Sequence, residues 1–298
     1  MSGELEFAFA LLVNGLSIGM LYALIALGFV LVYKATDAIN FAQGEFVMLA
    51  GFVAALVLGI EGVPAVVGVA AAVAVMILFS FALERIVLRP LLGRPIIAVI
   101  MATIGLGAML RGLPPITVGG ETRAISLGIG DTPIQIWSAT LPPIQVLGVV
   151  VTLAFLGLFT WFFMKSRMGI AMRAVADNQQ VAMAMGINVE RYFALAWGMA
   201  GVVSAFGGVI WGSMLGVDVH LALVGLKVFP VVILGGLDSI IGAVVGGLIV
   251  GVVESFAAGY LDPYVGGGTK DFAPYVLMII ALMFRPYGLF GTHKIERV

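Results

Sequence analysis

The sequence has little charge. Asp, Glu, Lys and Arg make up 10% of its 298 residues, whereas soluble domains average about 25%. Hydrophobic residues make up 62%. A soluble protein needs polar groups over its surface, and one core of this size cannot enclose so many apolar side chains. A lipid bilayer removes this conflict because it is an apolar solvent for the outside of the protein. The composition therefore predicts an integral membrane protein.

Cysteine is absent, which excludes disulfides, iron–sulfur clusters and thiolate metal sites. The two histidines, His220 and His293, are far apart in the sequence, so no metal site is predicted. The net charge of −1 provides no basic surplus for nucleic acid. No Gly-x-x-x-x-Gly-Lys-Ser/Thr phosphate loop occurs, and Gly266–Lys270 resembles one only superficially. We therefore predict that the chain is not an enzyme and binds no cofactor of its own.

Long apolar runs fill most of the chain. About 20 apolar residues are needed to cross the ~30 Å hydrocarbon core of a bilayer. A shorter apolar piece, about 222–237, contains Lys227 and Pro230, so it is either a full crossing or a broken, re-entrant helix. The expected fold is an all-α polytopic membrane protein with about eight or nine transmembrane helices in a single domain over 1–298. The other candidate spans are roughly 7–33, 41–60, 63–84, 95–112, 144–164, 193–215, 239–258 and 273–290.

Lys and Arg residues divide unequally between the two sides of the predicted membrane. One set of connections (34–40, 84–95, 165–192 and 285–298) holds 11 of them, and the alternate set (1–6, 60–62, 111–143, 216–221 and 259–272) holds 3. Cytoplasmic loops carry the positive excess. The N-terminus is therefore expected outside and the C-terminus in the cytoplasm, which needs an odd number of crossings and favours counting 222–237 as the ninth.

Two connections are long. The outer loop 112–143 is rich in glycine and proline, and we expect an ordered surface loop there rather than a helix. The inner segment 165–192 is rich in helix formers between Gly169 and Gly186. It predicts short helices that lie at the cytoplasmic face.

Two polar or glycine-rich interruptions, Asn40–Glu45 and Gly235–Ser239, break apolar sequence in the two halves of the chain. Paired interruptions of this kind are typical of broken helices at a transport path. Backbone groups freed by a broken helix cannot face lipid, so they must face protein or a wet cavity. The predicted path residues are Asn14, Ser17, Asn40, Phe41, Gln43, Glu45, Gly235, Gly236 and Ser239.

Three charged residues fall inside predicted spans. Glu45 has two interpretations: a gate or helix-anchoring group beside the path, or a carboxylate near the cytoplasmic interface that is hydrated or bonded to backbone N–H groups. Lys227 and Glu254 are expected to form a structural ion pair between neighbouring segments rather than a substrate site.

Several ordered motifs resemble one known family over nearly the whole chain. They are Asn14–Gly28, Ile39–Glu45, Arg173–Asn188, Leu234–Ser239, Gly242–Gly247 and Phe284–Gly291. The chain resembles the LivH-type permeases of bacterial branched-chain amino acid ABC importers. Gln43 stands where that family often has histidine. Relatives also carry urea, short amides and aromatic acids, so the resemblance implies a range of small solutes and does not identify one of them.

The resemblance also implies partners. Such a permease pairs with a second, LivM-like permease or a second copy, in the bacterial inner membrane. Two ATPase subunits, which use ATP and Mg, dock at the cytoplasmic face, and a periplasmic binding protein delivers the solute. The matching coupling residues are Gly169, Arg173, Asp177, Ala182 and Gly186, although the Glu-Ala-Ala typical of importers lacks its glutamate here.

Two other classes of protein stay open at this point. An ion-coupled secondary transporter would need intramembrane carboxylates, for which Glu45 and Glu254 are the candidates. A passive solute channel would need neither an ATPase nor a binding protein. The helical inner segment argues against both, because neither has an ATPase to contact.

Overall fold

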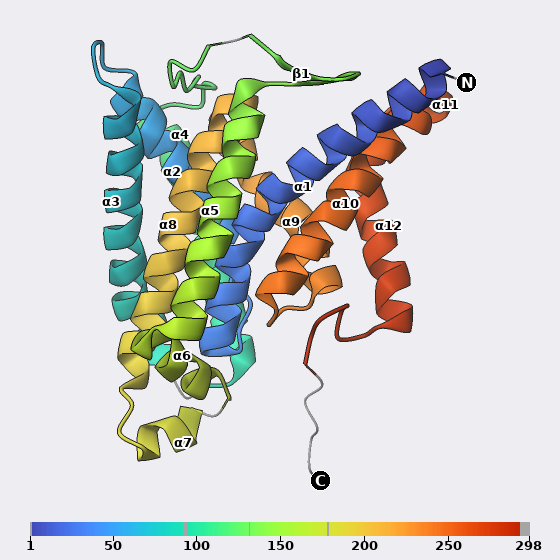
Figure 1. Ribbon diagram of the computed structural model, residues 1–298. Helices are drawn as coiled ribbons and strands as arrows, with labels where there is room; N and C mark the ends of the chain where they lie inside the picture. The colour runs from blue at the N-terminus through green and yellow to red at the C-terminus, as the bar shows by residue number, and fades with distance from the viewer. Residues whose placement is uncertain (1, 92–93, 131, 178, 293–298) are drawn as a thin grey trace. The chain divides into compact units, whose positions relative to one another are not determined.

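The structure is a computed structural model that describes residues 2–91, 94–130, 132–177 and 179–292 (Figure 1). His293, Lys294 and Arg297 lie outside the described residues. The chain divides into two compact units. Unit 1 comprises 1–26, 129–152 and 226–298, and unit 2 comprises 27–128 and 153–225. Whether the chain acts as a single domain stays a prediction.

Most of the described chain is helical, which confirms the predicted all-α membrane fold. Each of the nine apolar segments predicted from the sequence contains one helix within the described residues. In the part of the chain that the structure describes, six helices are long and apolar enough to cross a bilayer: α1 (Ser2–Thr36), α3 (Ala65–Leu83), α4 (Ile96–Thr117), α5 (Pro143–Lys165), α8 (Val189–Leu215) and α10 (Ile240–Tyr260). α3 continues through the π-helical turn η1 (Glu84–Leu88) and the 3-10 turn η2 (Arg89–Leu91).

Two shorter apolar helices occur in the described ranges, α2 (Gln43–Leu58) and α9 (Leu223–Gly235), which follows the 3-10 turn η3 (Val219–Ala222). The last helix, α12 (Thr269–Phe284), is also short. At about 1.5 Å per residue, α2 covers only about 24 Å, less than the ~30 Å hydrocarbon core. A helix this short begins or ends inside the membrane, and non-helical residues complete the crossing.

The outer connection differs from its prediction at one end. The expectation of a loop from residue 112 is wrong for 112–117, because α4 continues through Pro114 and Pro115 to Thr117. Proline removes a backbone donor but leaves its carbonyl, and the Val118 N–H still donates to the Pro114 carbonyl oxygen at 2.9 Å. Farther along, β1 (Ile134–Ile136) pairs antiparallel with β2 (Ala139–Leu141).

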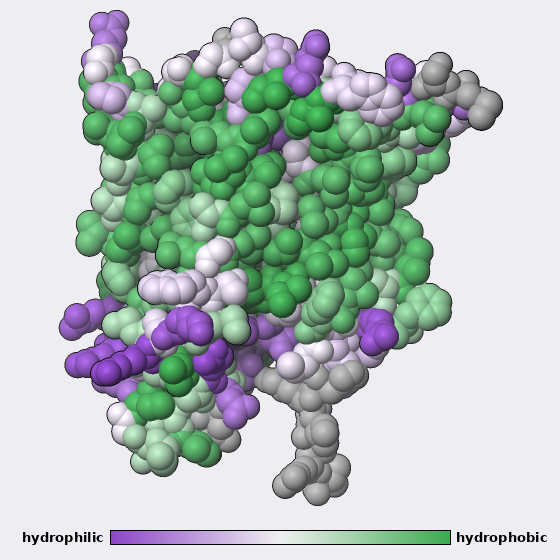
Figure 2. All heavy atoms as spheres, viewed as in Figure 1, coloured by the Kyte–Doolittle hydropathy of each residue, from purple (hydrophilic) through white to green (hydrophobic). Residues whose placement is uncertain are grey.

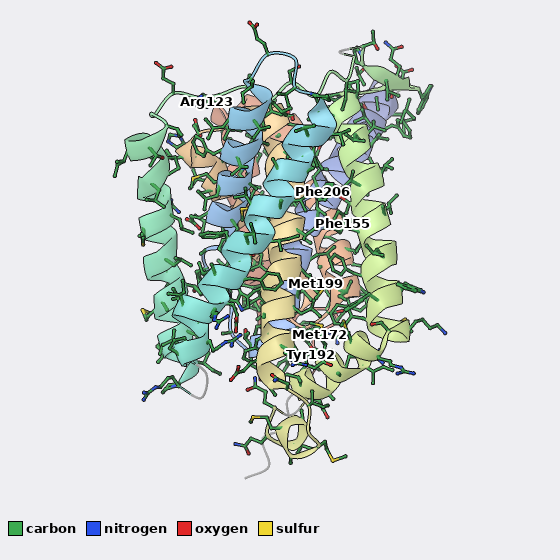
Figure 3. The ribbon with its side chains drawn as sticks, turned by 90° about the vertical axis from the view of Figure 1, so that its left-hand side faces the viewer. Arg123, Phe155, Met172, Tyr192, Met199 and Phe206 are labelled. Atoms are coloured by element: carbon green, nitrogen blue, oxygen red, sulfur yellow. The ribbon has the colours of Figure 1, made fainter. Side chains whose placement is uncertain are left out.

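The residues after α4 are tied to the end of α8. Arg123 and Val217 exchange two backbone hydrogen bonds, of 2.9 and 2.8 Å. The Arg123 side chain donates to the Val118 carbonyl oxygen at 2.7 Å (Figure 3). This part of the connection is therefore joined to the end of α8 by backbone hydrogen bonds. Figure 3 also shows Phe155 of α5 and Phe206 of α8 facing each other, with ring centroids 4.9 Å apart.

The inner segment folds into α6 (Arg167–Asp177) and α7 (Gln179–Ala184). α7 ends in a Schellman-type turn: the Gly186 N–H donates to Met183 and the Ile187 N–H to Ala182, both at 3.0 Å. Gly186 has a φ of 82°, which suits glycine. The predicted short helices are therefore present. Figure 2 shows hydrophobic side chains along α3 and hydrophilic ones gathered around its lower end and α6.

In unit 1, α11 (Asp262–Val265) and the start of α12 are joined through one carboxylate. The Asp262 side chain accepts hydrogen bonds from the Thr269 hydroxyl and from the Thr269 N–H, the latter at 2.8 Å. These two bonds hold the pKa of Asp262 below its ordinary value. The three glycines between them, Gly266, Gly267 and Gly268, all have positive φ, so the tight connection depends on them.

The predicted orientation can be tested with single cysteines, because the native chain has none. Ser126 and Gln180 are both exposed, in the outer connection and in α7. Because Lys and Arg favour the inner side, an impermeant thiol reagent added to intact cells should label Ser126→Cys and spare Gln180→Cys. Both positions should react once the cells are broken, and the cysteine-free chain should never react. If the reagent labelled only position 180 in intact cells, the membrane orientation would be opposite to the predicted one.

Candidate functional site

The chain is broken between α1 and α2, inside unit 2. α1 ends at Thr36, and Asp37 adopts a φ of 56°, a left-handed conformation uncommon for residues other than glycine. The next residues are not helical until Gln43. Asn40, Ala42 and Gln43 are fully buried. The interruption that the sequence indicated at Asn40–Glu45 is therefore a break whose second helix begins in the interior.

Uncharged polar side chains satisfy one another at this break. The Asn40 amide donates to the Gln43 side-chain oxygen at 3.1 Å, and the Gln43 amide donates to Ser204 Oγ at 2.9 Å. The Asn40 oxygen accepts from the Ala42 N–H at 3.0 Å. The Phe41 N–H donates to Thr103 Oγ1 of α4 at 3.2 Å. Unpaired polar groups are costly in an apolar interior, so this network fixes the broken backbone and holds a row of dipoles in place.

Gly28 makes room for the network on α1. A Cβ atom built on Gly28 would lie 2.1 Å from Gln43 Nε2, so the Gln43 side chain lies directly against the α1 backbone. Gly44 and Gly225 do the same for the start of α2. A Cβ on Gly44 would lie 2.2 Å from the Ala222 carbonyl oxygen. The close packing of this break therefore depends on three glycines.

Glu45 lies in the first turn of α2 and forms an ion pair with Arg111. Its exposed fraction is 3%, and its carboxylate accepts a hydrogen bond from Arg111 of α4. The Arg111 side chain is 46% exposed. Gly107, one turn before Arg111, leaves space for the carboxylate, since a Cβ there would lie 3.3 Å from Glu45 Cδ. This burial favours Glu45 as a helix-anchoring group over a hydrated interfacial carboxylate.

Sequence reasoning missed Arg111 as the partner because it assigned residue 111 to the outer loop. The signal that could have found it is the spacing of Gly107 and Arg111, which share one face if the helix runs past residue 112. Phe46, the neighbour of Glu45, is fully buried and packs edge-on against Phe79, with ring centroids 5.3 Å apart. It belongs to the core of unit 2.

The second interruption, Gly235–Ser239 in unit 1, is of another kind. It is a short connection between α9 and α10, in which Gly236 has a φ of 106° and Ser239 caps α10 by accepting from the Gly242 N–H at 2.9 Å. Residues 288–292 cover it: the Leu289 N–H donates to the Leu234 carbonyl at 2.8 Å, and the Phe290 N–H donates to the Gly235 carbonyl at 3.0 Å. Asp238 accepts from the Thr292 N–H. The role of Gly235, Gly236 and Ser239 in a path stays a prediction.

Asn14 and Ser17 lie at a polar contact between α1 and α5 in unit 1. The Gln145 amide donates to Asn14 Oδ1 at 3.0 Å and to Ser17 Oγ at 2.8 Å. Sequence reasoning missed Gln145 because it falls at the start of a predicted span, although a lone glutamine in an apolar run was an available signal. Here the three side chains hold two helices together.

Lys227, Glu254 and Asp271 form a charged cluster in unit 1. Lys227 Nζ lies 3.2 Å from Glu254 Oε1 and 2.6 Å from Asp271 Oδ1. Lys227 and Glu254 are the two residues that the sequence analysis paired. Asp271, the third member, is 58% exposed at the start of α12. A cation held between two carboxylates on different helices acts as a cross-link among α9, α10 and α12.

The coupling residues predicted in 165–192 divide by exposure. Gly169 and Ala182 are buried, and a Cβ on Gly169 would lie 2.3 Å from the Phe162 carbonyl oxygen. Arg173, Asp177 and Gly186 are exposed. The apolar surface of α7 and its end is carried instead by exposed Val181, Met183 and Met185.

No group of three or more His, Asp or Glu side chains comes together as a metal site in the described ranges. What these ranges do contain is several membrane-spanning helices, one helix broken at buried polar residues, and charged side chains neutralised in pairs. Non-helical backbone at membrane depth is tolerated where it is enclosed by protein or lines a cavity, and it is typical of transporters. The fold and this site therefore define a multi-pass membrane protein of the transporter class.

The comparisons with known proteins identify the family. Residues 11–283 match the family described as branched-chain amino acid transport system / permease component, and the chain belongs to this family. It is 32% identical over 303 residues to the high-affinity branched-chain amino acid transport system permease protein BraD of Pseudomonas aeruginosa, covering 96% of this chain and 97% of the relative. The LivH protein of Escherichia coli K12 is also 32% identical, over 96% of each chain.

A more distant relative is the probable branched-chain amino acid transport permease protein LivH of Methanocaldococcus jannaschii. It is 28% identical, over 93% of this chain and 91% of its own length. The resemblance to LivH-type permeases inferred from the sequence is thereby confirmed. These relatives are transport permeases and not enzymes.

Proposed function

We propose that this chain is the transmembrane permease subunit of an ATP-driven, binding-protein-dependent importer for branched-chain amino acids in the bacterial inner membrane. Its partners are a second permease, LivM-like or a second copy, two ATPase subunits and a periplasmic binding protein. ATP and Mg are used by the ATPase subunits, and this chain binds no cofactor. Family membership and 32% identity over 96% of the chain support this function.

The observation that carries the proposal is the break at Asn40–Glu45. The amides of Asn40 and Gln43 are fixed, uncharged dipoles in the interior of unit 2. Such dipoles suit a zwitterionic solute that must bind weakly enough to leave again. Asn14, Ser17, Phe41, Gly235, Gly236 and Ser239 complete the set of proposed path residues. Glu45 is paired with Arg111 and anchors α2 without binding the solute.

The charged residues argue against the other classes of transporter. An ion-coupled secondary transporter needs a carboxylate that gains and loses its ion during the cycle. Glu45 and Glu254 are each paired with a basic side chain, Arg111 and Lys227. Urea, amides and aromatic acids are kept as the alternative solutes. A passive channel would make no use of an apolar docking surface on the inner side.

That docking surface consists of three exposed apolar side chains in α7 and directly after it, Val181, Met183 and Met185. Met183 and Met185 are 56% and 77% exposed. Exposed apolar side chains that gather on a segment outside the membrane mark an interaction site. The buried residues Gly169 and Ala182 shape the segment, and the exposed Arg173, Asp177 and Gly186 flank the contact with an ATPase subunit.

The function can be tested by reconstituting the chain with its permease partner, ATPase subunits and binding protein. Loaded binding protein should stimulate ATP hydrolysis and drive leucine uptake. Met183→Asp should lower both by about tenfold or more, since it places a charge in the apolar contact, while the protein stays folded. Normal stimulation and uptake by Met183→Asp would contradict the docking role of Met183. ATP hydrolysis without any leucine uptake by the unmodified importer would contradict the assignment of branched-chain amino acids as the solute.

Asn188→Asp is the matched control. It adds the same negative charge close to α7 at an exposed position. Asn188 caps α8 by accepting from the Arg191 N–H at 3.2 Å, and an aspartate can accept the same bond. This variant should therefore hydrolyse ATP and import leucine like the unmodified protein.

A further inference from the structure

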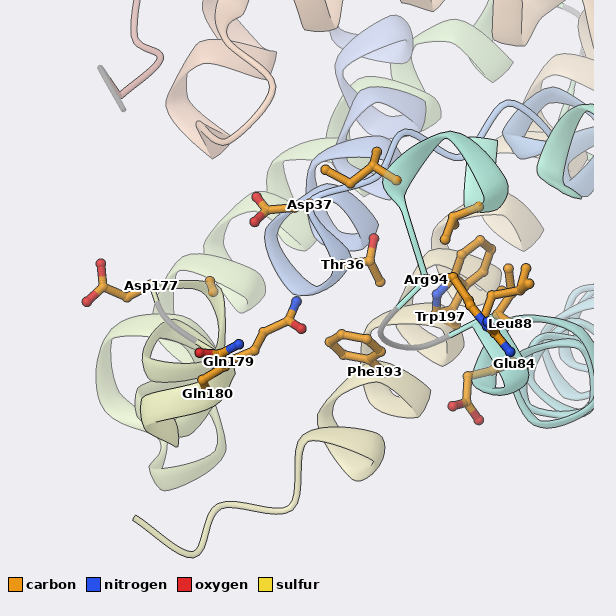
Figure 4. Close-up of a pocket in the computed structure, with 14 residues that line it drawn as sticks. Thr36, Asp37, Glu84, Leu88, Arg94, Asp177, Gln179, Gln180, Phe193 and Trp197 are labelled. Carbon is orange, nitrogen blue, oxygen red and sulfur yellow. The ribbon is translucent and has the colours of Figure 1, made fainter. Parts of the chain in front are cut away.

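Unit 2 contains a cavity of about 400 Å³ on its predicted inner side (Figure 4). One wall comes from the end of α1, from η1 and the start of α4, and from α8. The other wall comes from α6 and α7. Pockets for small molecules usually measure about 300–1,000 Å³. The cavity therefore has room for a small solute, between the inner segment and the ends of the membrane helices.

The apolar part of the lining is aromatic and branched. Leu88, Phe193 and Trp197 contribute to it, and all three are buried, Trp197 with an exposed fraction of 1%. These residues belong to the packed framework of η1 and α8, so they form a fixed surface. Such a surface favours a branched or aromatic side chain over a small polar solute.

Arg94 provides a cation at the same end of the cavity. Figure 4 shows Arg94 with Leu88 and Trp197, and Asp177 with Gln179 and Gln180 at the opposite end. Among the described residues Arg94 has no ion-pair partner. The buried carboxylate of Glu84 is already bonded at both oxygens by Arg89, at 3.2 and 3.0 Å. The guanidinium of Arg94 is therefore available to bind a carboxylate with two parallel hydrogen bonds.

Two backbone features single out this cavity. Glu84 and Leu88 belong to the π-helical turn η1, and such turns occur frequently at functional sites. Asp37, which also lines the cavity, has the left-handed φ of 56°. Conformations of this kind are retained where the surrounding structure holds them, often at ligand sites.

We propose that this cavity binds an α-amino acid with a branched or aromatic side chain from the cytoplasmic side. Arg94 holds its carboxylate, and Leu88, Phe193 and Trp197 contact its side chain. The ammonium group faces the side of the cavity that carries Asp37 and Asp177, whose negative field favours it. The proposal rests on the proposed function for the identity of the ligand, which is the imported solute itself.

A bound amino acid would act on the transport cycle. It would contact both the membrane helices and the α6–α7 segment that is proposed to contact the ATPase. A ligand that binds one arrangement of these elements better than the others shifts the population toward it. Accumulated product would therefore hold α6 and α7 in the arrangement seen here and slow further import.

Binding can be measured by cysteine protection, with L-leucine as the probe. The assembled importer would carry Gln180→Cys, which lies in the lining, in an otherwise cysteine-free chain. Leucine should slow maleimide labelling at position 180 several-fold. Glycine, 4-methylpentanoate and isoamylamine, which lack the side chain, the ammonium and the carboxylate, should each slow it less. Met168→Cys, which is exposed on α6 but lies outside the lining and outside the proposed docking surface, should be unaffected.

The matched variants are Arg94→Gln and Arg85→Gln. Arg85 is an exposed arginine of η1 that does not line the cavity. Arg94→Gln should weaken leucine protection about tenfold or more because a charge-assisted bond is lost, and Arg85→Gln should keep it. The proposal would be overturned if leucine still protected position 180 in Arg94→Gln, or if Arg85→Gln lost protection equally. It would also be overturned if leucine gave no protection in the importer that carries Gln180→Cys alone.

Transport separates this inference from the proposed function. Uptake into empty proteoliposomes tests the function, and both arginine variants should import leucine normally. Leucine loaded inside should lower the initial uptake rate several-fold in the unmodified importer and in Arg85→Gln, and leave Arg94→Gln unaffected. Normal uptake with no effect of internal leucine would overturn the regulatory site alone. Protection without any leucine uptake would contradict the proposed function and leave the binding site standing.

Discussion

Replacing Arg111 with methionine should destabilise the permease and abolish its transport. Glu45 is 3% exposed, and its carboxylate is bonded to Arg111. Without Arg111, a buried charged group is left unpaired, which costs about 1–3 kcal/mol or more. Because Glu45 lies in the first turn of α2, the loss acts directly on the start of that helix. Thermal unfolding in detergent and leucine uptake in proteoliposomes measure the two effects.

Glu45→Gln separates the charge from the shape. It removes the carboxylate charge at nearly constant volume, so it should slow uptake without changing which solutes are carried. The double variant Glu45→Gln/Arg111→Met should recover much of the stability that Arg111→Met loses, since no orphaned charge remains. Equal unfolding temperatures for the single Arg111 variant and the double variant would mean that the pair is not coupled. A changed solute preference in Glu45→Gln would mean that Glu45 contacts the solute.

The second large effect is expected at Gly247. A Cβ on Gly247 would lie 2.5 Å from the Gly19 carbonyl oxygen, and the neighbour is backbone that no rotamer change can move. Gly247→Ala should therefore separate α10 from α1 in unit 1, at a cost of about 1–3 kcal/mol or more. The protein should unfold at a lower temperature and yield less monodisperse material in size-exclusion chromatography.

Gly157→Ala is the control for this substitution. Gly157 also lies inside a helix, but a Cβ there would meet nothing within 4 Å. Alanine has a better helix propensity than glycine by about 0.8–1 kcal/mol, so Gly157→Ala should be neutral or stabilising. If both variants unfolded at the same temperature, close helix approach at Gly247 would not be needed for folding.

The helices of this fold could be predicted because apolar length and composition determine them. Hydrophobicity locates each span but not its depth, so the sequence could not tell that α2 starts in the interior. That depth depends on the buried network of Asn40, Gln43 and Ser204, whose last member lies 161 residues farther along the chain. The type of each polar residue could be read from the sequence, but its partner could not.

The partners of charged residues were predicted where both lie in apolar runs, as for Lys227 and Glu254. They were missed where one member was assigned to a loop. Arg111 was placed outside because two prolines follow it closely, yet α4 continues through both. Asp271 was missed because it precedes the apolar part of α12. In a sequence, proline and charged residues indicate where a helix ends. In the structure, the end depends on which backbone groups still find hydrogen-bond partners.

The glycine contacts of α10 have a mechanical consequence for unit 1. Gly242 and Gly246 lie against the backbone of α9 at Gly235 and Val231, and the opposite side of α10 lies against the backbone of α1. A side chain can absorb a small displacement by changing rotamer, but a backbone in contact with another backbone cannot. The parts of α1, α9 and α10 within unit 1 should therefore move together as one rigid body. A displacement of residues 288–292, which are hydrogen-bonded to the end of α9 and the α9–α10 connection, should be transmitted to all three helices.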